Sequence, residues 1–136
     1  MPLVTKEGFE TLPETTYVTP EQLGEANEPL LAVEIPNDTD LSSLIPHFEK
    51  ITLIAVQFPS FADGRGFSVG RHLRRLGFDG ELRARGHIIA DQYPHALACG
   101  FDGVEIDEVM AERQPFEQWQ DAAKNVLPPY RVKVAS

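Results

Sequence analysis

Short apolar runs that alternate with segments of helical period constrain this 136-residue chain most strongly. From Pro29 onward we count four such units, which is the pattern of repeated βα units. The predicted strands cover residues 30–35, 51–58, 81–85 and 103–106, and the predicted helices cover residues 40–48, 66–76, 89–98 and 115–126. Parallel strands need long crossover connections, and each spacing between these strands allows one. We therefore predict an α/β fold with a mainly parallel sheet, either open or resembling half of a (β/α)8 barrel.

The ends of the predicted helices carry recognisable signals. We expect Asn37 or Asp38 to cap the first helix and Asp63 to cap the second, since both residue types favour that position. Asp63 could instead accept a hydrogen bond from a ligand hydroxyl or orient Arg65. Gly100 is expected to end the third helix. Because parallel strands end at the same edge of a sheet, we expect the loops from strand to helix to gather there.

The length favours a single domain with an N-terminal arm, a βα core and a tail. The arm, residues 1–29, is acidic and rich in proline, the core covers residues 30–127, and the tail covers residues 128–136. Within the arm, we expect Tyr17 and Val18 to pair at a sheet edge and residues 19–23 to form a short helical turn. The end of the tail, residues 130–136, has the weak alternation of an edge strand.

Charge and composition exclude several classes of protein. A formal net charge of -9 disfavours nonspecific nucleic-acid binding, because phosphate contacts supply most of that affinity. No apolar run reaches the roughly 20 residues that span a bilayer, and the start of the chain lacks a secretory signal. The single Cys99 has no disulfide partner, and the four histidines lack the spacing of a metal site. We expect a soluble, cytoplasmic protein without a bound metal.

The positive charge of the chain is gathered in one segment. Six of the eight arginines lie between Arg65 and Arg85, and the segment begins with a strand, a glycine turn and a helix. Backbone N–H groups at a helix start, together with nearby guanidinium groups, bind phosphate, sulfate or carboxylate. The predicted anion-binding residues are Gly64, Arg65, Gly66, Ser68, Arg83 and Arg85. The glycine spacing matches neither the dinucleotide fingerprint nor the phosphate loop.

Three polar residues at the predicted strand ends could move a proton, namely Asp63, His87 and Glu105. His87 and Asp91 are four residues apart, so a hydrogen bond between them could orient the imidazole. An alternative gives the charges a structural role. In it, an ion-pair network joins the arginines at positions 65, 83 and 85 to the carboxylates at positions 34, 105 and 107. Both interpretations agree with the sequence.

The predicted second helix carries Arg71, Arg74 and Arg75. We expect these side chains to form an exposed, solvated basic face, with the docking of an acidic partner as the alternative. Cys99 ends an apolar helical segment, where a small buried thiol is the default.

Three stretches carry a resemblance to a known family, and they cover residues 58–68, 80–84 and 91–102. The first reads F-P-S-F-A-D-G-R-G-F-S, the second G-E-L-R-A, and the third runs from Asp91-Gln92 to Cys99-Gly100-Phe101-Asp102. With them, residues 30–110 resemble an uncharacterised bacterial family whose members are described as oxidoreductases of sulfite reduction. The resemblance implies a place beside assimilatory sulfite reductase.

Three functions follow as hypotheses. The first is an accessory protein or oxidoreductase of assimilatory sulfite reduction, which docks on sulfite reductase or its electron donor and has an arginine-rich oxyanion site. Because six-electron reduction needs haem, iron–sulfur or flavin chemistry and this chain has one cysteine, we do not expect it to reduce sulfite alone. The second is a small non-redox enzyme that acts on a metabolite bearing phosphate, sulfate or carboxylate. The third is a non-catalytic interaction module that forms a homodimer through its open sheet edge. No motif identifies a cofactor, although the glycine turn could hold the phosphate of a flavin.

Overall fold

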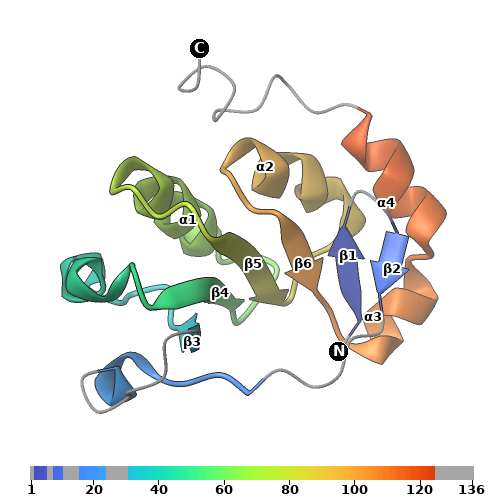
Figure 1. Ribbon diagram of the computed structural model, residues 1–136. Coiled ribbons are helices and arrows are strands. Elements are labelled where there is room, and N and C mark those ends of the chain that lie inside the picture. Colours follow the sequence, from blue (N-terminus) through green and yellow to red (C-terminus); the bar gives the residue numbers. More distant parts are fainter. Residues whose placement is uncertain (1, 6–7, 11–15, 24–30, 125–136) are drawn as a thin grey trace.

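The chain folds around one open β-sheet (Figure 1). The computed structural model describes residues 2–5, 8–10, 16–23 and 31–124. The described strands are β1 (Leu3–Thr5), β2 (Gly8–Glu10), β3 (Leu31–Ile35), β4 (Ile51–Phe58), β5 (Glu81–Gly86) and β6 (Gly103–Glu105), and they form a six-stranded sheet in the order β2-β1-β6-β5-β4-β3. Strands β3 to β6 run parallel, whereas β1 is antiparallel to both β6 and β2. The predicted α/β class and mainly parallel sheet are confirmed, and the sheet is open.

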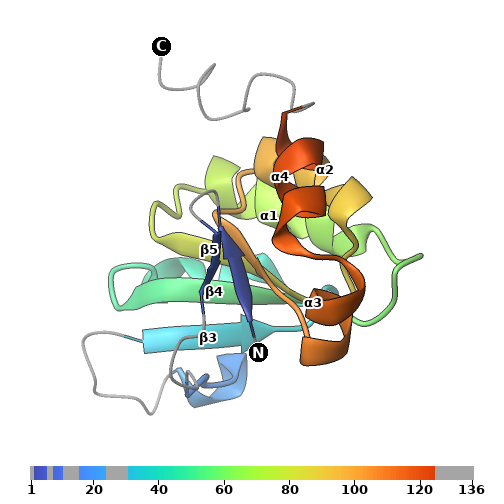
Figure 2. The ribbon, with the colours of Figure 1, turned by 90° about the vertical axis from the view of Figure 1, so that its right-hand side faces the viewer.

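Two of the helices that connect parallel strands lie on one face of this sheet (Figures 1 and 2). The described helices are α1 (Arg65–Arg75), α2 (Tyr93–Ala98), α3 (Glu108–Arg113) and α4 (Phe116–Ala123), with the 3-10 turns η1 (Pro20–Gln22), η2 (Leu41–Ser43), η3 (Ile45–His47) and η4 (Ala90–Gln92). Successive parallel strands are neighbours, so crossovers of one hand place their helices on the same face. Figures 1 and 2 show α1 and α2 on that face and residues 16–23 on the opposite face.

Two predicted helices differ in detail from the observed ones. Residues 40–48 form the two turns η2 and η3 instead of one helix, because Pro46 has no N–H to donate within a continuous helix. The cap predicted at Asn37 or Asp38 is wrong, since the side chain of Asp40 accepts the Ser42 N–H at 3.1 Å. The helix predicted over 89–98 begins as η4 and continues as α2.

The C-terminal part adds a helix that the sequence pattern did not predict. Helix α3 begins after Asp107, whose carboxylate accepts the Met110 N–H at 2.7 Å. Gly100 ends α2 with a positive φ of 99°, as predicted. Helix α4 begins after Pro115, while the end predicted for it and the predicted tail strand lie outside the described residues.

Two pieces of the N-terminal segment belong to the sheet. Leu3 and Val4 are buried in β1, where the sequence predicted an arm. The predicted edge pairing is confirmed at Val18, which donates to Ala32 at 2.8 Å and accepts from Glu34 at 3.0 Å. The predicted short turn is present as η1, on the sheet face opposite α1 and α2 (Figure 1).

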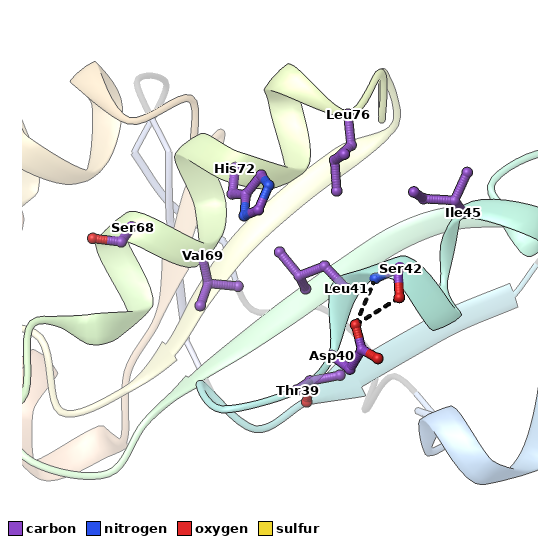
Figure 3. A pocket seen from close by; sticks show the side chains of 9 residues that line it. All are labelled: Thr39, Asp40, Leu41, Ser42, Ile45, Ser68, Val69, His72 and Leu76. Carbon is purple, nitrogen blue, oxygen red and sulfur yellow. Dashed lines mark hydrogen bonds between the residues drawn. The ribbon is translucent and has the colours of Figure 1, made fainter.

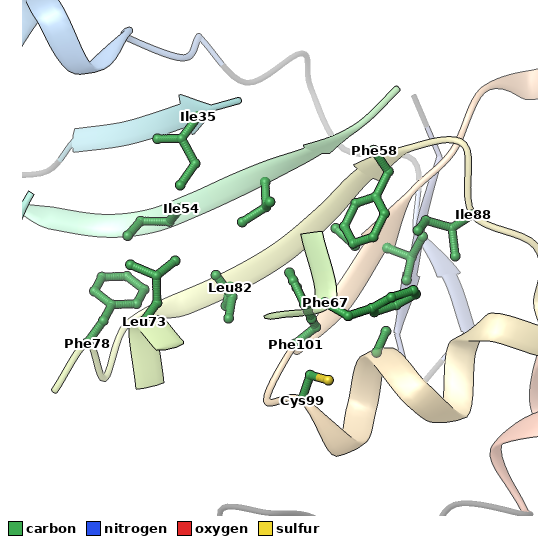
Figure 4. Packing of buried hydrophobic residues seen from close by; sticks show 14 of the residues in the cluster. Ile35, Ile54, Phe58, Phe67, Leu73, Phe78, Leu82, Ile88, Cys99 and Phe101 are labelled. Atoms are coloured by element: carbon green, nitrogen blue, oxygen red, sulfur yellow. The ribbon is translucent and has the colours of Figure 1, made fainter. Parts of the chain in front are cut away.

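The core lies between the sheet and α1 and α2 (Figure 4). Phe58 from β4 packs edge-on against Phe67, with ring centroids 4.9 Å apart, and against Phe101 at 6.0 Å. Two glycines of α1 make room for these rings. A Cβ atom at Gly66 would lie 2.4 Å from the Phe58 ring, and one at Gly70 would lie 2.3 Å from the Phe101 ring. Close packing of helix on sheet therefore depends on glycine at both positions.

Candidate functional site

The carboxyl ends of β3 and β4 hold an ion pair between Asp63 and Arg65. The Arg65 Nε donates to Asp63 Oδ1 at 3.1 Å, and its Nη2 donates to Oδ2 at 2.9 Å. The Asp63 carboxylate also accepts the backbone N–H of Arg65 at 3.2 Å and the Asn37 amide at 3.0 Å. These bonds, led by that of the Arg65 side chain, hold the pKa of Asp63 well below its usual range. A carboxylate so stabilised is a weak proton acceptor at neutral pH.

The start of α1 differs from the predicted anion-binding turn. Gly64 is the N-cap residue without a side-chain cap, and Asp63 accepts the N–H of Arg65, the first residue of α1. A Cβ at Gly64 would make an ordinary contact with the Phe67 ring at 3.8 Å, whereas one at Gly66 would clash with the Phe58 ring. Ser68 is exposed one turn further along α1. The close approach that the prediction assigned to both glycines is therefore blocked at Gly66 by the core.

His87 lies at the same edge of the sheet, just beyond β5. Its Nδ1 is 2.8 Å from the carbonyl oxygen of Pro59, and since a carbonyl only accepts, Nδ1 carries the proton. The Nε2 atom of the neutral ring is then the acceptor. His87 precedes η4, and its imidazole bonds to Pro59 instead of Asp91. The ring of Phe61 stands against it with centroids 5.2 Å apart.

Arg83, Arg85 and Glu105 lie on the sheet face opposite α1, apart from this edge. Arg85 on β5 is directly opposite Glu105 on β6 and Gln57 on β4. Because side chains alternate along a strand, Arg83 projects to the same face as Arg85. The sequence predicted that shared face correctly. The predicted polar set is therefore divided between the edge and the second face of the sheet.

Carboxylates surround both guanidinium groups on that face. Arg85 pairs with Glu34, and the Nε atom of Arg85 is 3.6 Å from Glu105. The other carboxylate oxygen of Glu34 accepts the Gln57 amide at 2.6 Å. Arg83 pairs with Glu81, and its Nη1 is 3.7 Å from Glu105. Arg83 and Glu105 are 6% and 7% exposed, so these charges need partners whether or not a ligand binds. The contacts favour the structural ion-pair network over an open anion site for Arg83 and Arg85.

A tyrosine from the N-terminal segment covers this network. The Tyr17 hydroxyl donates to Glu105 Oε2 at 2.6 Å, and its ring lies 5.3 Å from the guanidinium carbon of Arg85. Burial first, and then the bond to Glu105, raise the pKa of Tyr17. The sequence offered no signal for this contact, because the two residues are 88 positions apart.

The other residues predicted for the ion-pair network have different partners. Arg65 meets Asp63 instead of a distant glutamate, and Asp107 caps α3. The basic face predicted on α1 is wrong for Arg74, whose side chain is 5% exposed. Arg71 is half-buried, with Nη2 3.6 Å from the sulfur of Cys99. Cys99 is buried, and burial raises the pKa of its thiol.

A groove of about 410 Å³ runs between α1 and η2 (Figure 3). Its apolar side chains come from both elements and from η3, and its polar ones stand along the rim. The lining residues are Thr39, Asp40, Leu41, Ser42, Ile45, Ser68, Val69, His72 and Leu76. Only Ser68 among them belongs to the predicted site.

Two further features concern the described residues as a whole. No group of three or more His, Cys, Asp or Glu side chains among them could hold a metal ion. None of the helices in the described ranges combines the length and apolar character needed to cross a membrane.

The fold is that of a small mixed α/β protein with an open, mostly parallel sheet. The chain belongs to a family of bacterial proteins of unknown function, DUF934, whose model matches residues 32–136. The match begins in β3 and takes in the edge residues and the charged sheet face. No curated protein and no solved structure matches the chain.

Proposed function

We propose that the protein is an accessory protein of assimilatory sulfite reduction, and that it works by binding a partner protein through the loop from Pro59 to Arg65. We call this segment the edge loop. It lies inside the stretch that carries the family resemblance. The observation that supports the proposal most is Phe61, which is 43% exposed in a loop that is itself held firmly.

Several contacts fix the edge loop in the conformation that presents Phe61. Gln92 donates its side-chain amide to the Phe61 carbonyl at 3.0 Å, and Ser60 accepts the Ala62 N–H at 3.1 Å. The imidazole of His87 supports the ring from one side. A rigid loop loses little conformational entropy on binding, and aromatic and arginine side chains dominate the energetics of protein interfaces.

The polar residues favour a binding role over catalysis. Two of the three predicted catalytic residues, Asp63 and Glu105, are held in ion pairs with arginine. His87 keeps an acceptor nitrogen, but its ring also supports Phe61. The link to sulfite reduction comes from the resemblance, and the partner we propose is sulfite reductase or its electron donor.

A direct binding measurement tests this proposal. The purified protein is titrated against immobilised sulfite reductase, and separately against its electron donor, both from the same bacterium. Phe61→Ala should weaken binding about tenfold or more, as expected of an interface hot spot. Val109→Ala is the matched control, because Val109 is an apolar residue that is 56% exposed on α3. Absence of binding to both proteins, or equal effects of the two substitutions, would contradict the proposal.

A small oxyanion at Arg65 is a second candidate function. The pair with Asp63 uses Nε and Nη2, while Nη1 has no partner among the described residues and the side chain is 68% exposed. Sulfate, sulfite or phosphate should then raise the melting temperature of the protein. The increase should disappear in Arg65→Ala and persist in Arg113→Ala, which removes an exposed arginine from α3. An unchanged increase in Arg65→Ala would exclude this site.

A further inference from the structure

The groove between α1 and η2 has the composition of a binding site for a small molecule, and it is separate from the edge loop. Leu41, Val69 and Leu76 form its apolar floor (Figure 3). Ile45 stands at its lip and is 42% exposed, so it adds apolar surface that a ligand could cover. The volume of about 410 Å³ lies within the range of small-molecule sites. We propose that this groove binds a small organic cation, an amine attached to a compact apolar body.

The negative charge at the rim of the groove favours a cationic ligand over a neutral or anionic one. Asp40 is the only carboxylate among the lining residues, and none of them is a lysine or an arginine. Its Oδ1 accepts both the N–H and the hydroxyl of Ser42, at 3.1 and 2.7 Å. These bonds lower the pKa of Asp40, and Oδ2 has no partner among the described residues. An ionised carboxylate with one free oxygen, beside apolar surface, is complementary to an ammonium group on an apolar body.

The rest of the lining suits the body of such a ligand. In Figure 3 the imidazole of His72 lies between Val69 and Leu76 on the α1 side, with Leu41 facing it from η2. A flat ring beside aliphatic groups provides contact area for an aromatic or aliphatic body. The amine supplies orientation and the body supplies most of the buried surface, as in other ligand pockets.

Three probes of nearly equal size and different charge test the inference. 2-Phenylethylamine, 2-phenylethanol and phenylacetate are titrated into the full chain, and backbone amide shifts are followed by NMR. We expect saturable shifts at the groove residues, with the amine bound roughly two- to fivefold more tightly than the alcohol and phenylacetate weakest. Asp40→Asn keeps a capping side chain and should remove the preference for the amine. Ile45→Ala should weaken the binding of the amine and the alcohol, whereas Val109→Ala should leave it unchanged.

The opposite results would overturn the inference. Absence of saturable shifts in the groove up to the solubility of the amine would show that the groove binds no such ligand. Equal binding of amine and phenylacetate, or an amine preference that survives Asp40→Asn, would remove the role of the carboxylate. Neither result affects the test of the edge loop, because that test depends on Phe61.

Discussion

The Arg74 guanidinium forms a salt bridge of 2.8 Å with Asp102, and the same Asp102 oxygen accepts the backbone N–H of Leu82 at 2.9 Å. Arg74 also donates to the carbonyl oxygens of Gly100 and Phe78, both at 3.0 Å, and of Gly80 at 2.7 Å. One buried side chain of α1 therefore joins the two turns that lead into β5 and β6. We expect this clamp to hold helix and sheet in register.

Arg74→Ala should lower the free energy of unfolding by about 3–5 kcal/mol, because three backbone carbonyl groups lose this donor and Asp102 loses the salt bridge to Arg74 while it keeps the Leu82 N–H. Urea denaturation measures the change. Arg113→Ala removes an exposed arginine and should change the free energy of unfolding by no more than about 0.5 kcal/mol. Equal losses in the two variants would show that the clamp does not stabilise the fold.

Gly70→Ala should lower the free energy of unfolding by about 1–3 kcal/mol, because the added methyl group overpacks the core against Phe101. The new Cβ would lie 2.3 Å from that ring, so the helix or the ring must move. Ser68→Ala on the exposed face of α1 is the control, and it should be neutral or slightly stabilising. Thermal denaturation compares the two, and a stabilised Gly70→Ala variant would refute the packing argument.

Tyr17→Phe and Tyr93→Phe should have opposite outcomes although the chemical change is the same. The Tyr17 hydroxyl bonds to Glu105, so its removal should cost about 1–3 kcal/mol of folding free energy. The Tyr93 hydroxyl is buried without a hydrogen-bond partner among the described residues. Its removal should therefore be neutral or stabilising. Denaturation curves at neutral pH measure the free energy of unfolding of both variants. A larger decrease in Tyr93→Phe than in Tyr17→Phe would contradict these hydrogen-bond assignments.

The folded protein should lose stability as the pH rises above about 10, the ordinary pKa of tyrosine. Burial raises the pKa of Tyr93 to about 12, and burial with the Glu105 bond raises that of Tyr17. In this range the unfolded chain releases protons that the folded chain keeps, so the stability falls with pH. Denaturation between about pH 9 and 11 measures the slope, which should be shallower in Tyr17→Phe. Equal slopes would mean that Tyr17 does not titrate abnormally.

Arg65→Ala should raise the pKa of the Asp63 carboxyl toward its ordinary value, because Arg65 is the main cause of its low pKa. In the native protein, the stability that this pair provides is present above the ordinary aspartate pKa and is lost as the pH falls through the lower folded value. Carboxyl NMR shifts followed from neutral to acidic pH measure the pKa. Arg113→Ala should leave the Asp63 titration unchanged, and an unchanged titration in Arg65→Ala would disprove the pairing in solution.

The strands were predictable because their signal is local. The apolar run at residues 51–58 is long enough to identify β4, and the alternation of charged and apolar residues over 81–85 identifies β5 and placed Arg83 and Arg85 on one face correctly. The bounds of the helices were harder to predict from the sequence. The apolar period runs without a break through residues 40–48 and 89–98, but each segment contains a proline, Pro46 or Pro94, and folds as two shorter elements. Short α3 has no buried residue and hence no apolar stripe to reveal it.

The sequence by itself determined the α/β class, the four parallel strands and the presence of charged residues around them, because hydrophobic period and turn chemistry act over a few neighbouring residues. Only the tertiary structure decided which charges meet. The register of β4, β5 and β6 brings Arg85 beside Glu105, and the N-terminal segment brings Tyr17 across the sheet to the same carboxylate. Such contacts depend on how distant segments pack, so no local pattern separates a structural ion pair from a binding site.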